Sequence, residues 1–257
     1  MKGIREIFYE HEGKLIHKWD NYFEVYERYF SKYRGQKLNI LEIGIAHGGS
    51  IQLWKKYFGD QVHVYALDIN PECKSLEEEN TTIFIGSQSD PVFLESIKTQ
   101  LPELDIILDD GGHTMLQQIV SFEHLYSKVK QGGVYMVEDT CTSYWYEFHG
   151  GFRKPSSFVE YSKNLIDTLY EGHIENEPRL VVNEITRNIN SIAFYDSIIV
   201  FDKKLRSAPF HLQKGNTTIK MMPDSTLKKI TLFEKIREKL FGKRNTTFQK
   251  NARGTLQ

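Results

Sequence analysis

The chain has 257 residues, of which 40% are hydrophobic, 13% aromatic and 26% charged. This composition can bury a core and excludes a low-complexity or collagen-like chain. The net charge of −1 gives no argument for nucleic acid binding, and two cysteines cannot form a disulfide framework or a Cys-only zinc site. Neither a signal-like N-terminus nor a long apolar span is present in the sequence, so we expect a soluble, cytoplasmic protein.

Helical and strand patterns alternate along most of the chain. Apolar residues at spacings of three and four predict a helix over residues 4–34. Short apolar strands follow, separated by a helix capped by Ser50, a helix capped by Asp90 and a helix over 114–129. The predicted strands are 38–44, 63–69, 81–85, 104–108 and 133–137. This repetition predicts an α/β fold with a doubly wound, mostly parallel sheet.

The pattern changes near residue 190. Two apolar segments, 191–195 and 198–201, flank Asp196-Ser197 and predict a β-hairpin. Five parallel strands followed by a hairpin make the seven-stranded sheet of the class I methyltransferase type, whereas flavodoxin-like and plain dinucleotide-binding sheets lack this ending. We expect three parts: a helical segment over 1–36 that covers the site, the sheet domain over 37–205 and a basic extension over 206–257.

The C-terminal extension differs in charge from the rest of the chain. Residues 214–257 hold 11 Lys and Arg against 3 Asp and Glu, which leaves the remainder acidic. A basic amphipathic helix is predicted from Leu227, Ile230, Phe233, Ile236, Leu240 and Phe241. Its apolar face could lie on an anionic membrane surface, or pack on the body or a second subunit, which is the favoured alternative. We expect a homo-oligomer.

Glycines and one acid mark the end of the first strand. The candidate cofactor-binding residues here are Glu42, Gly44, His47, Gly49 and Ser50. Glycines allow a tight turn and close approach of a ligand to a helix N-terminus. The form E-x-G-x-x-x-G-G is not the GxGxxG fingerprint, and an acid inside the strand suits a cofactor with a cationic amino-acid end better than a pyrophosphate. A glycine turn without a ligand is the alternative.

Other strand ends could complete a cofactor site. Asp68 ends the second strand, where a carboxylate can bind both hydroxyls of a ribose, although alone it would more often be a turn acid. Ser87 and Gln88 follow the third strand and could meet an adenine edge, while helix capping explains them nearly as well. Asp109, at the end of the fourth strand, is assigned to the same site.

The densest polar group is Asp109-Asp110-Gly111-Gly112-His113, at the end of the fourth strand. Glu138 and Asp139 end the fifth strand at the same edge. Four carboxylates repel one another unless a cation joins them, and all-oxygen ligands favour magnesium or calcium over zinc. Capping acids on separate loops are the alternative. His113 could be a metal ligand, a core residue or a general base, and we favour the base because the carboxylates suffice for a metal.

An aromatic loop with glycine hinges follows the fifth strand. Aromatic faces with polar tips suit a sugar or polycyclic ligand, and packing of the loop on the sheet is an equal alternative. The candidate substrate residues are Tyr144, Trp145, His149 and Arg153.

From about residue 17 to 202, the chain resembles the metal-dependent sugar O-methyltransferases of antibiotic biosynthesis, which act on mycinamicin, tylosin and related glycosides. It is also similar to the wider group that includes cephalosporin hydroxylase-type proteins. The motifs that carry the resemblance are Glu42-Ile-Gly44 with Gly48-Gly49-Ser50, Asp109 to His113, and Val137-Glu138-Asp139. Two features depart from the family. The macrolide enzymes carry a large N-terminal auxiliary domain, whereas only about 35 residues precede the first predicted strand in this sequence. The basic residues beyond 205 have no match in the family.

The resemblance implies S-adenosylmethionine (AdoMet) at the glycine turn and magnesium held by Asp110, Glu138 and Asp139. The resemblance also implies that a methyl group is transferred to a sugar hydroxyl of a small-molecule or glycan acceptor. The metal would bind neighbouring hydroxyls of the acceptor, and His113 would be the base.

Two other functions remain open. A metal-dependent hydrolase could use the same carboxylates, but it would not need Glu42 or Asp68. A catalytically silent protein of this fold would be expected to lack a metal acid or His113, and none is missing. A nucleic acid partner is not expected, because the body is acidic and lacks a basic stripe.

Overall fold

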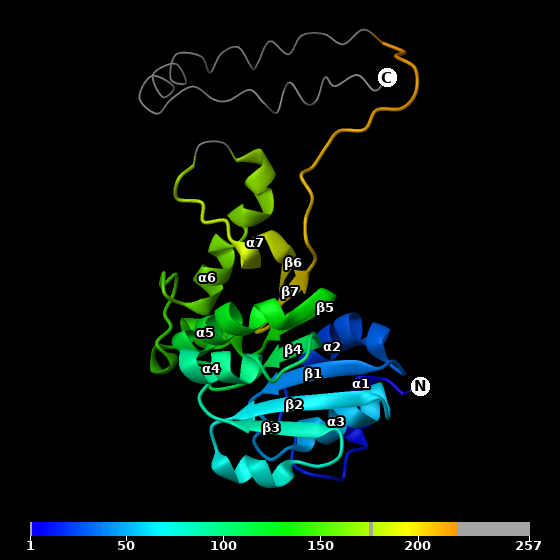
Figure 1. Cartoon of the computed structure of the whole chain (residues 1–257), viewed down its shortest axis with the longest axis vertical. Coiled ribbons are helices and arrows are strands. Elements are labelled where there is room, and N and C mark those ends of the chain that lie inside the picture. Colours follow the sequence, from blue (N-terminus) through cyan, green and yellow to red (C-terminus); the bar gives the residue numbers. More distant parts are fainter. Residues whose placement is uncertain (1, 175–176, 220–257) are drawn as a thin grey trace. The chain divides into compact units, whose positions relative to one another are not determined.

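A computed structural model describes residues 2–174 and 177–219 of the chain (Figure 1). The predicted amphipathic helix over 227–241 lies outside the described residues. The chain divides into two compact units, of which the larger comprises Met1–Leu169 and Val182–Arg206 and holds the whole sheet. Of the described residues, the smaller comprises 170–174, 177–181 and 207–219. None of the helices described in either unit is long and apolar enough to cross a membrane.

A seven-stranded sheet forms the centre of the larger unit (Figure 1). Its strands are β1 (Leu38–Ile43), β2 (Val62–Asp68), β3 (Thr81–Ile85), β4 (Leu104–Asp109), β5 (Val129–Val137), β6 (Ile189–Phe194) and β7 (Ile199–Lys203). The order is β3-β2-β1-β4-β5-β7-β6; β1 to β5 are parallel, and β7 is antiparallel to both neighbours. The predicted fold class, a mostly parallel sheet of the class I methyltransferase type ending in a hairpin, is therefore confirmed.

The strand register explains why the acidic residues meet. Ile43 pairs with Asp109, and Asp109 pairs with Val137, so β1, β4 and β5 end at one height. The next backbone N–H groups continue the pattern, since Asp110 donates to Ile43 and Glu138 donates to Asp109, each at 2.9 Å. The strand order also reverses between β1 and β4, which is where open α/β sheets bind ligands.

Helices cover both faces of the sheet. The α-helices are α1 (Ile4–Tyr9), α2 (Tyr22–Phe30), α3 (Gly49–Phe58), α4 (Pro91–Lys98), α5 (Met115–Leu125), α6 (Phe158–Asn164) and α7 (Glu184–Asn188). Short 3-10 helices are η1 (Ser31–Tyr33), η2 (Pro71–Leu76), η3 (Tyr126–Lys128), η4 (Thr140–Tyr144), η5 (Tyr146–Phe148) and η6 (Asp167–His173). Residues of α1, α2 and α3 pack on one face and those of α4, α5 and α6 on the other.

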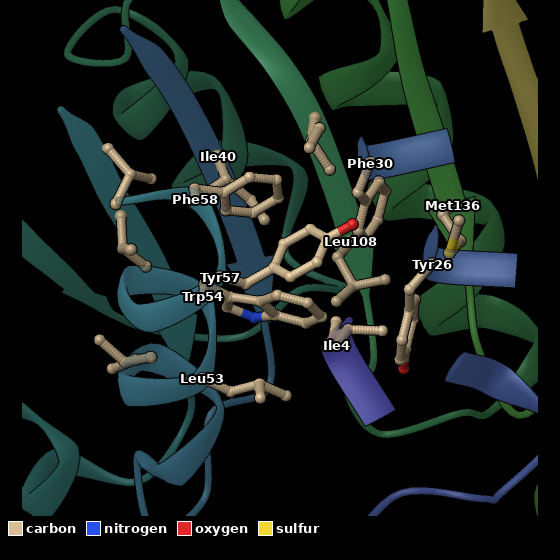
Figure 2. Packing of buried hydrophobic residues seen from close by; sticks show 14 of the residues in the cluster. Ile4, Tyr26, Phe30, Ile40, Leu53, Trp54, Tyr57, Phe58, Leu108 and Met136 are labelled. Carbon is tan, nitrogen blue, oxygen red and sulfur yellow. The ribbon is translucent and has the colours of Figure 1, made fainter. Parts of the chain in front are cut away.

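The core under α1 to α3 is largely aromatic. Figure 2 shows the rings of α3 facing those of α2 above the apolar side chains of the sheet. Tyr26 and Phe30 stack at 5.6 Å between ring centroids, and both meet Trp54 edge to face at 5.3 and 5.7 Å. This contact fixes α2, and with it the N-terminal segment, against the first half of the sheet.

The single helix predicted over residues 4–34 is wrong. After α1 ends at Tyr9, residues 10–21 form an irregular arm, and helix resumes only at Tyr22. The arm is tied to α3, because the Lys14 N–H donates to the side chain of Gln52 at 2.8 Å. The apolar spacing was misleading, since Leu15 and Trp19, on which it relied, are 65% and 55% exposed.

The helix ends are only partly as predicted. Ser50 is not an N-cap: α3 begins at Gly49, after Gly48 in the left-handed region at φ 75°. Asp90 is the N-cap of α4, as predicted, and accepts from the backbone N–H groups of Val92 and Phe93. The helix predicted over 114–129 ends earlier, at Leu125, because η3 and then β5 take over the last residues.

Candidate active site

A cavity of about 710 Å³ lies at the carboxyl ends of the first four strands. Its wall is built from the turn after each strand and from the arm. The lining segments include 15–18, 43–47, 67–70, 86–88 and 110–113. Of the predicted cofactor-binding residues, Gly44, His47, Ser50, Asp68, Ser87 and Gln88 line this cavity. The predicted catalytic residues Asp110 and His113 line it too, so the candidate cofactor and reaction sites share one wall.

The turn after β1 depends on a glycine and on Asp68. Gly44 has a φ of 83°, and a Cβ there would lie 2.2 Å from the carbonyl oxygen of Asp110, so any side chain would collide with the next strand end. One carboxylate oxygen of Asp68 accepts from the N–H groups of Ile45 and Ala46 at 3.0 and 3.1 Å. Asp68 therefore holds the turn in shape as well as lining the cavity.

Three predicted cofactor residues lie behind the cavity wall. Glu42 is fully buried and accepts from the Ser50 hydroxyl at 2.8 Å, and burial raises the pKa of its carboxyl to about 7. Gly49 packs against the arm, since a Cβ there would lie 2.3 Å from the Lys14 and Leu15 carbonyl oxygens. These residues shape the site from beneath.

Asp109 is the third residue behind the wall. It accepts hydrogen bonds from Ser121 and, at 3.0 Å, from the side chain of Gln88. Burial raises the pKa of Asp109 to about 6. Gln88 also accepts from the Gly112 N–H at 2.7 Å, so it joins the end of β3 to the acidic turn after β4.

Lys18 projects from the arm into the acid cluster. Its ammonium forms ion pairs with Asp110 and, at 2.9 Å, with Glu138, and the side chains of Lys18 and Glu138 are 2% and 1% exposed. Tyr26 of α2 donates to the other oxygen of Glu138. Burial opposes a charge on Lys18, but the carboxylates outweigh it, and the pKa of Lys18 is raised above its usual value. Burial and the charge of Asp110 raise the pKa of Glu138 well above its usual value.

Asp139 lies on the other side of the cluster, next to His113. The Nε2 atom of His113 is 3.4 Å from Asp139 and 3.9 Å from Asp110, and one ligand atom from each of these three residues lies within 4.8 Å of the others. Tyr22 donates its hydroxyl to Asp139. Of the predicted metal acids, the structure thus groups Asp110 and Asp139 with His113, while Glu138 faces Lys18 and Tyr26.

The backbone is strained at this point. His113 and Asp139 have φ values of 57° and 51°, in the left-handed region that non-glycine residues rarely adopt. The Thr142 hydroxyl lies within hydrogen-bond distance of the carbonyl oxygens of both residues, at 2.8 and 2.9 Å, and can donate its hydrogen to them. Such conformations cost about 1–3 kcal/mol each and persist where the surroundings impose them, often at functional sites.

The aromatic loop after β5 stands beside the cluster, outside the cavity wall. Its predicted substrate residues Tyr144 and Trp145 are 46% and 43% exposed, and His149 and Arg153 are exposed too. Phe148, which was not among the predicted substrate residues, contacts Trp145 and the ring of His113, with centroids at 5.9 and 6.5 Å. The loop can therefore present exposed rings next to the candidate base.

No protein-family model matches the chain. It is 30% identical over 200 residues to 8-demethyl-8-alpha-L-rhamnosyl tetracenomycin-C 2'-O-methyltransferase of Streptomyces olivaceus, covering 74% of this chain and 52% of the relative. It is 32% identical over 189 residues to mycinamicin VI 2''-O-methyltransferase of Micromonospora griseorubida, covering 69% of this chain and 47% of the relative. The MycE methyltransferase of the mycinamycin pathway, solved in complex with Mg and SAH, superposes with a TM-score of 0.72 at 27% identity, covering 79% of this chain and 55% of that one.

Over 74% and 69% of its length, the chain is thus similar to these two O-methyltransferases, and its fold is similar to that of MycE. The resemblance found in the sequence is thereby confirmed. The chain spans about half the length of the curated relatives that it matches. Four residues at the site were not among those predicted from the sequence: Lys18, Tyr22, Tyr26 and Phe148. Tyr22 and Tyr26 were counted in the apolar pattern of the predicted helix and were taken for core residues. Lys18 lies in the irregular arm, where no periodic pattern could indicate it.

Proposed function

We propose that the protein is an AdoMet- and magnesium-dependent O-methyltransferase that methylates a sugar hydroxyl. The observation that carries the proposal is the shared wall: Asp110 and His113 line the same cavity as the glycine turn and Asp68. A methyl donor in that cavity would lie beside both an acidic cation site and a base. The names of the curated relatives, which are O-methyltransferases of rhamnosyl and mycinamicin compounds, support the same chemistry.

AdoMet is proposed to occupy the cavity. Backbone groups of the turn after β1 would lie close to AdoMet, because Gly44 has no side chain to keep them apart. Ser87 and Asp68 offer hydroxyl and carboxylate groups along the wall. AdoMet supplies the methyl group, and the protein contributes binding and orientation.

The acid cluster fits a divalent cation on its own geometry. The ammonium of Lys18 already bridges Asp110 and Glu138, so these carboxylates point at a place where a positive charge is stable. Carboxylate oxygens are the ligands that Mg²⁺ prefers, and Asp139 adds another. When bound, the metal would lower the pKa of an acceptor hydroxyl.

His113 is proposed to remove the proton of that hydroxyl. His113 lines the cavity, and within the described part of the chain its Nδ1 atom has no hydrogen-bond partner. Asp139, 3.4 Å from Nε2, would stabilise the imidazolium that forms.

The acceptor is proposed to be a small glycosylated molecule or a glycan, docked against Tyr144, Trp145, His149 and Arg153. Exposed aromatic faces suit sugar rings. We further propose a cytoplasmic location and a homo-oligomeric state, as inferred from the sequence.

Calorimetric titration of the full chain with AdoMet and with NAD tests the cofactor assignment. We expect AdoMet to bind and NAD not to bind. The variant Gly44→Ala should lose AdoMet binding, because its Cβ would strike the Asp110 backbone. Gly3→Ala is the control, because Gly3 has a φ of −69° and a Cβ there would lie 3.8 Å from its nearest neighbour, a side-chain oxygen of Glu27. Binding of NAD in preference to AdoMet would refute the proposal.

A further inference from the structure

The carboxylates assigned to the metal already have a cation of the protein's own. Lys18 touches Asp110 and Glu138, and its side chain is 2% exposed. Its nitrogen also lies 6.0 Å from the centre of the Tyr26 ring. A lysine this deeply buried is rare unless it is paired, so its position indicates a defined role at the cluster.

The arm is built to deliver this side chain. Before Lys18, it is tied to α3 through Lys14 and Gln52, and its carbonyl groups lie so close to Gly49 that no side chain fits there. After Lys18, the side chain of Asn21 donates to the carbonyl oxygen of Asp196 at 3.0 Å. With both sides fastened, Lys18 is directed at the acids although it sits in irregular structure.

The charges of the cluster set up a competition. Ionised Asp110, Glu138 and Asp139 carry three negative charges, and Lys18 cancels one of them. A divalent cation that enters the cluster must share Asp110 and Glu138 with the ammonium or replace it. If it shares them, the two positive charges repel each other in a buried, weakly screened place. If it replaces the ammonium, the ion pairs of Lys18 with Asp110 and Glu138 are lost.

We propose that Lys18 is a tethered cation that competes with the divalent metal for Asp110 and Glu138, holding the acid cluster together until the metal arrives. The inference rests on the proposed metal-dependent function and adds a residue that sets metal affinity. A binding event that displaces a competing group is weakened by the free energy of the displaced contact. Lys18 therefore lowers metal affinity and stabilises the metal-free protein.

A lysine that only oriented the carboxylates would increase the affinity for the metal instead of lowering it. If Lys18 only arranged the carboxylates as metal ligands, removing it would weaken metal binding. The sign of the change in affinity distinguishes the two roles.

The test is the affinity of the full-length protein for Mn²⁺, measured by electron paramagnetic resonance of the free ion and by calorimetry. Lys18→Met keeps the length of the side chain and removes its charge. We expect it to bind Mn²⁺ at least tenfold more tightly than the wild type. Lys14→Met removes a lysine from the same arm away from the cluster, and Lys18→Arg keeps the charge; both should bind as the wild type does.

Thermal unfolding gives a second readout. Without metal, Lys18→Met should unfold at a lower temperature than the wild type, because the carboxylates are left without their cation. Its stabilisation by 10 mM Mg²⁺ should exceed that of the wild type. If Lys18→Met folds only with metal, purification in Mg²⁺ followed by chelation shows the same dependence.

The outcomes separate this inference from the proposed function. Equal or weaker Mn²⁺ binding by Lys18→Met, with clear binding by the wild type, would overturn the competition and leave the metal-dependent function standing. Absence of Mn²⁺ binding in every variant would overturn both.

Discussion

At the scale of single residues, His113 and Asp139 are held in a backbone conformation that costs stability. Both have positive φ values, and the Thr142 hydroxyl bonds the carbonyl oxygens of both. The strain places the imidazole 3.4 Å from a carboxylate at the edge of the cavity. A base needs both a free nitrogen and a group that stabilises its charge, and this arrangement supplies the second.

Replacing His113 by Ala should lower kcat by about a hundredfold or more, because the acceptor hydroxyl would lose its base. The affinity for AdoMet should change little. Steady-state kinetics at saturating metal, with calorimetry as the control, measures both. Turnover equal to that of the wild type would show that the base lies elsewhere.

Glu42 should make stability depend on pH. Folding raises its pKa from the usual 4.5 to about 7 by burial, so the folded state keeps a proton that the unfolded state has lost between these pH values. The free energy of unfolding should therefore fall, by about 2–3 kcal/mol, as pH rises from about 4.5 to about 7, and this contribution should be constant above.

Urea unfolding at pH 4.5 and pH 8 measures this difference. Asp109 and Glu138, whose pKa values are also raised, contribute equally to the wild type and to Glu42→Gln, so the comparison isolates the share of Glu42. The loss of stability between the two pH values should be smaller by about 2–3 kcal/mol in Glu42→Gln, while the exposed Glu12→Gln should match the wild type. A pH dependence unchanged in Glu42→Gln would contradict the buried, proton-binding carboxyl.

The sequence predicted the acids of the site because parallel strands end at one edge, which depends only on local patterns. It could not predict the partner of those acids. Lys18 reaches Asp110 and Glu138 across 92 and 120 residues, through an arm without periodic structure. Nor could it separate Asp68, which lines the cavity, from Asp109, which lies behind it, because both end a strand.

At the scale of elements, α2 links the aromatic core to the acid cluster. One part of the helix packs Tyr26 and Phe30 on Trp54, and the hydroxyl of Tyr26 reaches Glu138. The sequence indicated this helix correctly from Tyr22 onward but extended it through the arm. Apolar spacing alone could not reveal that Leu15 and Trp19 face solvent.

Tyr26→Phe should lower the free energy of unfolding by about 1–3 kcal/mol, because it leaves a buried oxygen of Glu138 without a donor while preserving the packing of the ring. Tyr9→Phe is the control, since Tyr9 is 71% exposed and should lose little. Chemical denaturation measures the stability of both variants. Equal stabilities of Tyr26→Phe and the wild type would contradict a stabilising hydrogen bond between Tyr26 and Glu138.

At the scale of the whole molecule, the sheet order places the cavity and the acids together. The switch between β1 and β4 opens the cavity, and β5 next to β4 brings Glu138 and Asp139 beside Asp110. This arrangement was predictable, because alternating strands and helices followed by a hairpin leave few topologies. The arm near the N-terminus adds the ammonium of Lys18 to this site, which the strand order alone does not predict.

Metal-dependent methyl transfer is tested by following labelled methyl from AdoMet to a rhamnosylated acceptor, with and without chelator. We expect transfer with Mg²⁺, loss of transfer in excess chelator, and recovery when Mg²⁺ is restored. Asp139→Asn should lower transfer and metal affinity but leave AdoMet binding nearly intact. Full transfer in excess chelator, or full activity of Asp139→Asn, would contradict a metal-dependent methyltransferase at these strand ends.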